Sequence, residues 1–240
     1  MAIIKTCATP EDLAKTATEH IVTVAAEAID DHDYFTIALA GGSTPRGTYE
    51  TLATIEFAQR MDWERAHIFW SDERAVSPDH KESNYRMAYE SMLKPLAIPE
   101  ENIHRVLSEL EPERAAHHYE DTLAEFFSQE PARFDLILLG LGTDGHTASL
   151  FPSTEAIHEK KETVIAHYVE KLENWRITFT PKLINAALNV TFLVSGQHKA
   201  SVLRQVLSGR YQPENLPAQI VRPDNGILRW MVDAEAADLL

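Results

Sequence analysis

The sequence has 240 residues, of which 44% are hydrophobic, and its formal net charge is −15 at pH 7. A chain of this length and composition can bury one sizeable core, so we expect a single domain over residues 1–240. The strong negative charge argues against a nucleic-acid surface, and it means that an anionic ligand would have to be held by a few local cations.

Helices and strands are predicted to alternate along the chain. Apolar residues recur at helical spacing behind Thr9, which can cap the first helix, and later apolar runs are short enough to be buried strands. In chain order, we predict a helix over 10–30, a strand over 34–40, a helix from Pro45 to about residue 55, a strand over 67–70, helices over 84–93 and 112–129, strands over 134–142, 163–169, 176–180 and 189–195, a helix over 197–208, and a strand over 227–232.

This alternation is typical of a mainly parallel sheet covered by helices on both faces. We therefore predict a Rossmann-like α/β fold. In such a sheet, ligands bind at the carboxyl ends of the strands, near the point where the strand order reverses. The polar segments that directly follow the predicted strands are therefore the candidates for a functional site.

The first polar segment is GGSTPRGTYE, between a predicted strand and a predicted helix. Gly42 lets the backbone approach an anion closely, and Ser43 and Thr44 add hydroxyl donors. The start of the next helix directs unpaired N–H groups toward negative charge. This pattern favours a phosphate or polyol site, and a plain glycine turn with a Ser/Thr helix cap is the alternative.

The second polar segment, WSDERAVSPDHKESN, begins at the end of the predicted strand over 67–70. It places Asp72 and Arg74 where the strand leaves the sheet, so a carboxylate and a guanidinium could face one ligand. Arginine can bind a phosphate or an oxyanion through several donors at once. A solvated charged loop is the alternative interpretation.

The third polar segment, LGTDGHTASLFP, puts Asp144 and His146 on a tight glycine loop, with the Ser149 hydroxyl close by in sequence. Histidine is the side chain best suited to general-base catalysis near neutral pH. Residues 140–145 also match the G-x-G-x-x-G pattern of dinucleotide sites. We reject that interpretation, because the pattern should open a helix early in a βαβ unit, whereas this match lies in mid-chain and soon reaches Pro152.

Two further basic residues lie at the ends of predicted strands or helices. Arg176 begins the strand over 176–180, and Lys199 opens the helix that follows the strand over 189–195. Either could supply the local positive charge that an acidic protein needs in order to bind an anion.

Several classes of site and location are not supported by the sequence. Cys7 is the only cysteine, which rules out an internal disulfide and a cysteine-based zinc site. His117 and His118 are adjacent in a predicted helix, and no H-E-x-x-H pattern is present, so we expect neither a metal nor a cofactor. No secretory leader and no run of about 20 apolar residues is present. We therefore expect a cytoplasmic protein without a membrane segment.

Taken together, these segments resemble the 6-phosphogluconolactonase family, within the larger group that includes glucosamine-6-phosphate deaminases. The resemblance covers about residues 38–200 and is carried, in order, by GGSTP, SDERAVSPDHKESN, LLGLGTDGHTASLFP, RITFT and FLVSGQHKA. Deaminases usually have D-E-Y where this sequence has Asp72, Glu73 and Arg74. They also have a glutamate at the position of Phe151. Both differences favour a lactonase.

The resemblance implies a hydrolase that converts 6-phospho-D-glucono-1,5-lactone to 6-phospho-D-gluconate in the oxidative pentose phosphate pathway. Hydrolysis at a lactone carbonyl requires a water molecule positioned for attack, a base that takes its proton, and stabilisation of the tetrahedral oxyanion. We expect His146 to be the base, with Asp144 or Asp72 orienting its imidazole. Arg74 is expected to stabilise the oxyanion or to hold the phosphate.

The remaining candidates are expected to bind the substrate. Lys199 and Arg176 are the expected phosphate clamps, and donors from Gly42, Ser43, Thr44 and Ser149 would complete the pocket.

Three other functions are weaker alternatives. An amino-sugar-phosphate deaminase or isomerase is the nearest of them. A non-catalytic sugar-phosphate sensor would normally carry a DNA-binding module. This chain is acidic and its α/β pattern begins almost at its first residue, so the sequence does not suggest such a module. A Ser-His-Asp hydrolase lacks its G-x-S-x-G motif. The expected oligomeric state is a monomer.

Overall fold

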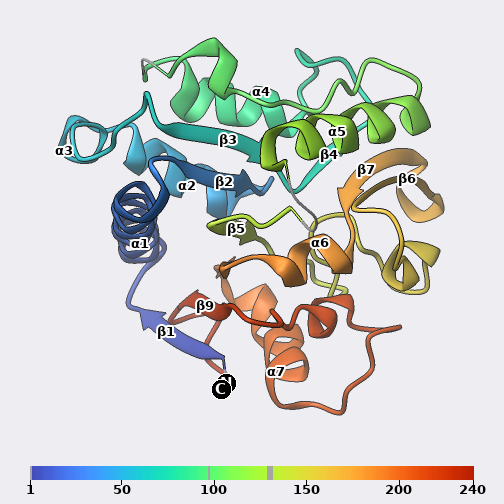
Figure 1. Ribbon diagram of the computed structural model, residues 1–240. Coiled ribbons are helices and arrows are strands. Elements are labelled where there is room, and N and C mark those ends of the chain that lie inside the picture. Colours follow the sequence, from blue (N-terminus) through green and yellow to red (C-terminus); the bar gives the residue numbers. More distant parts are fainter. Residues whose placement is uncertain (1, 97, 129–131) are drawn as a thin grey trace.

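The computed structural model describes residues 2–96, 98–128 and 132–240, and its larger sheet has six strands. These strands are β1 (Ile3–Cys7), β2 (Phe35–Leu39), β3 (Ala66–Trp70), β5 (Leu136–Leu139), β8 (Asn189–Val194) and β9 (Ile227–Asp233). They are arranged in the order β1-β9-β8-β5-β2-β3, and every neighbouring pair runs parallel (Figure 1). The predicted parallel α/β sheet is confirmed.

Helices cover both faces of this sheet. On one face lie α1 (Pro10–His32), α2 (Ser43–Leu52), α3 (Ile55–Ala58), α4 (Asn84–Ala88) and the π-helix η1 (Tyr89–Leu93). On the other face lie α5 (Pro112–Phe127), α6 (Pro181–Ala186) and α7 (Ala200–Ser208). Short 3-10 helices complete the chain: η2 (Glu100–Asn102), η3 (Glu155–His158), η4 (Glu170–Leu172), η5 (Gln197–Lys199) and η6 (Pro217–Ile220). Among the described residues, no helix has the length and apolar character needed to cross a membrane.

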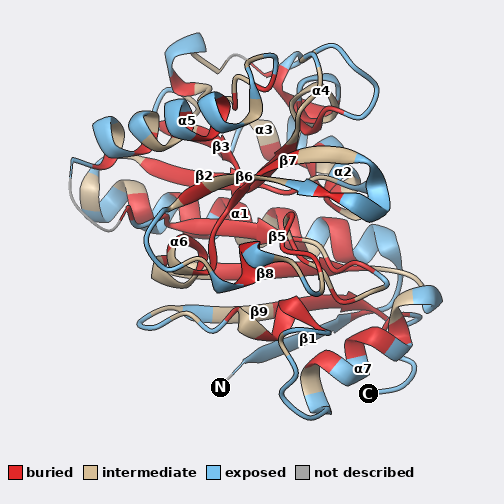
Figure 2. Cartoon of the chain, turned by 90° about the vertical axis from the view of Figure 1, so that its right-hand side faces the viewer, coloured by how far each residue is buried: buried red, intermediate tan, exposed pale blue. Residues whose placement is uncertain are grey.

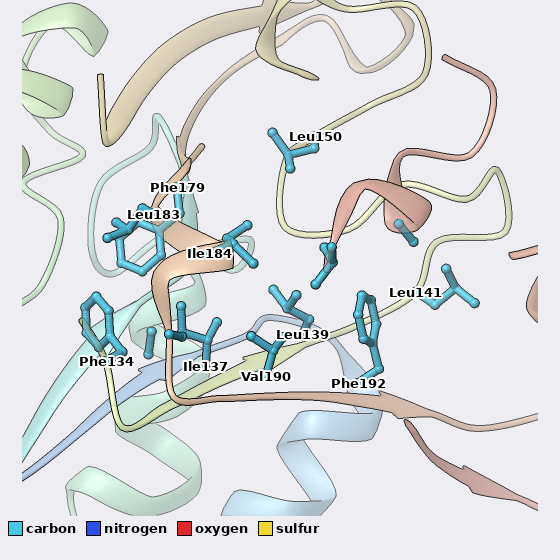
Figure 3. Packing of buried hydrophobic residues seen from close by; sticks show 14 of the residues in the cluster. Phe134, Ile137, Leu139, Leu141, Leu150, Phe179, Leu183, Ile184, Val190 and Phe192 are labelled. Carbon is cyan, nitrogen blue, oxygen red and sulfur yellow. The ribbon is translucent and has the colours of Figure 1, made fainter. Parts of the chain in front are cut away.

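Strand β5 shows why the sheet is buried on both sides. Its sequence LILL is apolar throughout, and successive side chains of a strand point to opposite faces. Leu136 and Leu138 pack with α1 and α2, whereas Ile137 and Leu139 pack on the other side, where Figure 3 shows them near Ile184 of α6. The buried strands therefore form the centre of the molecule, between exposed outer faces of the helices (Figure 2).

A second, three-stranded sheet differs from the prediction. It consists of β4 (Asp72–Arg74), β6 (Val164–Val169) and β7 (Asn174–Phe179), paired antiparallel in the order β4-β7-β6. The strands predicted over 163–169 and 176–180 therefore belong to a hairpin and not to the parallel sheet. The connection between them is too short for the crossover that parallel strands require.

The remaining differences concern short or irregular elements. Strand β1 and helix α6 were not predicted, because β1 is largely exposed and α6 is brief. The predicted helix over 84–93 is α4 continued by a π-helical turn, and the one over 197–208 begins with a 3-10 turn. Helix α5 ends before a left-handed Ser128, and the predicted last residue, 129, lies outside the described residues.

The strand order places a ligand crevice between β2 and β5. From β2 the chain first moves outward to β3, and then returns to build β5, β8 and β9 on the other side of β2. The strand order thus reverses between β2 and β5. The loops that leave these two strands diverge to opposite faces of the sheet, which opens a crevice at the carboxyl edge.

Two buried tyrosines hold the strand ends at this edge. The Tyr49 hydroxyl of α2 donates to the carbonyl of Ala40 (2.9 Å) and accepts from its N–H (3.0 Å). The Tyr119 hydroxyl of α5 does the same for Trp70, at 3.2 and 2.8 Å. Each tyrosine satisfies both backbone groups of a residue where the chain leaves the sheet, and burial raises the pKa of both hydroxyls.

Replacing Tyr119 with Phe should lower the free energy of unfolding by about 1–3 kcal/mol, because the N–H and C=O of Trp70 would be left buried without a partner. Urea denaturation followed by circular dichroism measures this. Tyr211→Phe is the matched control, since Tyr211 is 54% exposed, and it should change the free energy by less than about 0.5 kcal/mol. Equal effects of the two substitutions would contradict the role of the Tyr119 hydroxyl.

Candidate active site

A pocket of about 200 Å³ opens where the strand order reverses, between the loops that follow β2 and β5. Its lining brings together the predicted site residues Gly42, Asp72, Arg74, His146 and Lys199. These residues come from four separate segments of the chain. They meet because parallel strands end at the same edge of the sheet and because β4 turns back across that edge.

The closest polar contact at the pocket joins Asp144 and His146. Asp144 Oδ1 lies 2.5 Å from His146 Nδ1, and Lys171 Nζ lies 3.1 Å from the other carboxylate oxygen. The hydrogen bond from His146, assisted by Lys171, holds the pKa of Asp144 well below its usual range. An ionised carboxylate can only accept, so Nδ1 of His146 donates to it. In a neutral imidazole the lone pair then lies on Nε2, which is the tautomer that a general base requires.

The loop that carries this pair depends on two glycines. A Cβ at Gly142 would lie 2.0 Å from His146 Nδ1. Gly145 has a left-handed φ of 82°, and a Cβ there would lie 2.6 Å from a methyl carbon of Leu216. The Phe151 ring stacks on the imidazole with centroids 4.2 Å apart. The imidazole is thus held by its ring face and by Nδ1 together.

Residues 140–154, all of them described, contain turns and a single bridge but no helix. The G-x-G-x-x-G match at 140–145 therefore lacks the helix that a dinucleotide site needs, which agrees with the rejection of that interpretation.

Asp72 is held by a different set of partners. Its Oδ2 accepts from the Ser149 hydroxyl at 2.7 Å, and the Asn84 amide donates to its Oδ1 at 3.3 Å and to its carbonyl at 2.8 Å. Asn84 packs so closely on Gly41 that a Cβ there would lie 2.0 Å from the amide oxygen. The hydrogen-bond partner of the imidazole is therefore Asp144, while Asp72 presents a fixed carboxylate to the pocket.

Two arginines lie side by side on the second sheet. Arg74 and Arg176 are direct partners across β4 and β7, and only Arg74 reaches the pocket lining. Both Nε atoms are buried without a hydrogen-bond partner in the described part of the chain. Burial and the neighbouring charge of Arg74 lower the pKa of Arg176. Adjacent like charges are unfavourable, so this arrangement favours a bound anion.

Lys199 approaches the same pocket from the turn after β8. Its side chain is half-buried, and burial lowers the pKa of its ammonium group, although the charge of Asp144 opposes this shift. Among the residues that the structure describes, the ion pairs with Asp or Glu involve none of Arg74, Arg176 and Lys199. The two of these cations that line the pocket, Arg74 and Lys199, can therefore offer their positive charge to a ligand.

Several predicted binding residues lie next to the pocket rather than in its lining. Ser149 is buried, with its hydroxyl bound to Asp72, and Arg176 is buried beside Arg74 on the neighbouring strand. Ser43 and Thr44 form the first turn of α2. The N-cap of this helix is Gly42, which has no capping side chain, so N–H groups of the first turn remain available to an anion.

Sequence reasoning missed the supporting residues Asn84, Lys171 and Leu216. Asn84 closes the segment SDERAVSPDHKESN, and its place in that segment was the only available signal. Lys171 and Leu216 belong to segments without a recognisable pattern. In the described part of the chain, no three His, Cys, Asp or Glu side chains are grouped to hold a metal ion, and His117 and His118 are exposed on α5.

Comparison with known proteins places the sequence among named relatives. The family described as glucosamine-6-phosphate isomerases/6-phosphogluconolactonase matches residues 8–230. A Synechocystis protein named 6-phosphogluconolactonase is 43% identical over 224 residues, which cover 92% of this chain and 90% of that protein. A protein of the same name from Haemophilus influenzae is 37% identical, over 85% of this chain and 87% of its own length.

Solved structures give the same result. The 6-phosphogluconolactonase from Trypanosoma brucei superimposes with a TM-score of 0.90 at 30% identity, covering 100% of this chain and 99% of that one. A monomeric glucosamine-6-phosphate deaminase, at 21% identity, shares the fold with a TM-score of 0.83 over 99% of this chain and 100% of its own. By the extent of these matches, the chain belongs to the glucosamine-6-phosphate isomerase/6-phosphogluconolactonase family.

Proposed function

We propose that this protein hydrolyses 6-phospho-D-glucono-1,5-lactone to 6-phospho-D-gluconate, a step of the oxidative pentose phosphate pathway. The observation that carries the proposal is one pocket that holds an imidazole, oriented by an aspartate, together with Arg74 and Lys199, which form no ion pair with a described Asp or Glu. Its relatives named 6-phosphogluconolactonase match over most of their length. The imidazole suits the ester bond of the lactone, and the cations suit its phosphate.

In the proposed reaction, Nε2 of His146 takes a proton from water while the water oxygen bonds to the lactone carbonyl carbon. The Asp144 carboxylate stabilises the imidazolium that forms, as in other Asp–His pairs. When the tetrahedral intermediate collapses, the bond from the carbonyl carbon to the ring oxygen breaks. The imidazolium then returns its proton to that oxygen. The products are a free hydroxyl group and a carboxylic acid, which releases its proton to the solvent to become the carboxylate, and no covalent enzyme intermediate is needed.

We assign the phosphate to Lys199, Arg74 and the first turn of α2. Arg74 and Arg176 repel each other in the free protein as well as during the reaction. A phosphate dianion of the bound substrate relieves this repulsion for as long as the substrate is bound, whereas the reaction oxyanion exists only briefly. The phosphate is therefore the better partner for Arg74. Arg176 lies beside Arg74 on β7 and adds its positive charge to the same region. Asp72, fixed by Ser149 and Asn84, is left to accept hydrogen bonds from sugar hydroxyl groups. Binding of the phosphate and hydroxyls would hold the carbonyl carbon near His146.

One contact separates this proposal from an amino-sugar-phosphate deaminase. The Phe151 ring is stacked on His146 at the position where deaminases usually carry a glutamate. A phenyl ring can neither donate nor accept the protons that ring opening of an amino sugar requires. The deaminase reaction therefore lacks one of its acid–base groups in this pocket.

We further propose that the chain acts as a single-domain monomer in the cytoplasm, without a nucleic-acid partner. The net charge of −15 is unsuited to a phosphate backbone, and one cysteine allows no internal disulfide.

Replacing His146 with Ala should reduce lactone hydrolysis by about 10²- to 10⁴-fold, because the base is lost. The substrate is generated in situ from glucose 6-phosphate, and its hydrolysis is measured above the spontaneous rate. His118→Ala, at an exposed position of α5, is the matched control and should leave the rate unchanged. A wild-type protein no faster than background would refute the proposed function. Ammonia release from glucosamine 6-phosphate would instead support a deaminase.

Replacing Lys199 with Ala should raise the KM for the phosphorylated lactone by about 10- to 100-fold, the cost of one charge-assisted contact, with little change in kcat. The phosphate-free lactone provides an internal control, because its hydrolysis should respond little to the same substitution. Lys94→Ala, on the exposed surface, should change neither parameter. The phosphate assignment of Lys199 is wrong if KM is unaltered, or if both lactones are affected equally.

Free lysine loses its proton at about pH 10. The affinity for 6-phosphogluconate should already fall at lower alkaline pH, before free lysine would titrate. The reason is the lowered pKa of Lys199: its ammonium group loses the proton earlier than a free lysine does, and only the charged form attracts the phosphate. Calorimetric titration at several pH values measures this. Lys199→Arg keeps its charge, so its affinity should be nearly constant over that range. An equal decline in both proteins would exclude Lys199 as the titrating group.

A further inference from the structure

The last strand of the sheet ends in a buried carboxylate that no sequence motif marks. Asp233 is the final residue of β9 and is only 1% exposed. Strand β9 lies between β1 and β8, with Val232 opposite Val194 and Asp233 opposite Cys7. Asp233 therefore lies at the carboxyl edge of the sheet, beside the loop that leaves β8.

The Asp233 carboxylate binds that loop directly. Its Oδ2 accepts from the Ser195 hydroxyl at 2.5 Å, and the N–H of Gly196 lies 3.0 and 3.1 Å from its two oxygens. The N–H of Ala236 donates to Oδ1 at 2.7 Å. A buried carboxylate is costly unless hydrogen bonds satisfy it, so these donors and the carboxylate fix one another.

The loop bound by Asp233 leads straight to Lys199. Gly196 has a left-handed φ of 94°, and its carbonyl accepts from the N–H of Lys199 at 2.9 Å. The intervening residues form the 3-10 turn η5. The N–H of Gly196 is thus bound by Asp233 while its C=O binds the backbone of Lys199. One residue, Gly196, therefore links the buried carboxylate to the residue that carries the pocket ammonium group.

We propose that Asp233 is a positioning residue that sets the affinity for the substrate phosphate by fixing the Ser195–Gly196 turn from which Lys199 enters the pocket. This inference rests on the proposed function, since it concerns the same pocket. Asp233 itself does not line the pocket. It acts through Lys199, and its removal should weaken phosphate binding without removing the base.

Asp135 provides a matched comparison within the same sheet. It is also buried, at 3% exposure, and its carboxylate accepts from the N–H and hydroxyl of Thr36 at 2.8 and 2.7 Å. It precedes β5, however, and so lies at the opposite edge of the sheet from the pocket. Its other oxygen lies 3.0 Å from His32 Nε2, a contact that Asp233 does not have. Asp135 is thus likewise buried and hydrogen-bonded to backbone and hydroxyl donors, but it has no connection to Lys199.

The test compares Asp233→Asn with Asp135→Asn in the full chain, after circular dichroism has established that each is folded. Asp233→Asn should raise the KM for the phosphorylated lactone about tenfold and leave kcat within about twofold of wild type. Asp135→Asn should lower the thermal midpoint but leave KM unchanged. An unaltered KM in folded Asp233→Asn, or an equal rise in Asp135→Asn, would overturn the inference. Should Asp233→Asn not fold, Ser195→Ala decides: a raised KM supports the inference and an unaltered one overturns it.

A double-mutant cycle shows whether Asp233 acts through Lys199. In the Lys199→Ala background, Asp233→Asn should cause no further rise in KM, because the ammonium group that it positions is absent. A full additional effect would mean that Asp233 acts elsewhere. Calorimetric binding of 6-phosphogluconate repeats the comparison without turnover. If wild type fails to hydrolyse the lactone but Asp233→Asn still weakens this binding, the proposed function fails while the positioning role stands.

Discussion

The hydrogen bond between Asp144 and His146 is the interaction on which the rest of the site depends. It keeps the proton on Nδ1 and leaves Nε2 free to accept one, and it requires both side chains to lie on one short loop. That loop is possible only because Gly142 leaves room for the imidazole and Gly145 leaves room for Leu216. Leu216, in the C-terminal third of the chain, therefore packs against the loop that carries His146, although that third supplies neither Asp144 nor His146.

The positive charges of the pocket, like the Asp144–His146 pair, depend on contacts between distant parts of the chain. A protein with a net charge of −15 can attract a sugar phosphate only through a local excess of cations. The structure concentrates them by placing Arg74 opposite Arg176 and by bringing Lys199 to the same pocket from another strand. Buried Asp233 is bound to neutral donors, so it holds the Lys199 turn without forming an ion pair that would cancel the ammonium charge.

The sequence predicted the parallel sheet because its buried strands are short apolar runs, such as LILL at 136–139, separated by helical patterns. It also predicted which segments meet, since parallel strands end at one edge. It could not show that residues 72–74 form a strand, because their polar side chains carry no strand pattern. Nor could it show that Ser149 faces Asp72, because that partner lies 77 residues away and only the folded chain brings the two together.

The tautomer of His146 tests the central claim most directly. In ¹⁵N-labelled protein, at a pH at which the imidazole is neutral, long-range ¹H–¹⁵N correlation spectra distinguish a protonated ring nitrogen from a bare one, and the His146→Ala spectrum assigns the signals. We expect a protonated Nδ1 and a bare Nε2 in wild type, and a loss of this preference in Asp144→Asn. A neutral ring with its proton on Nε2 in wild type would contradict the assignment of His146 as the base.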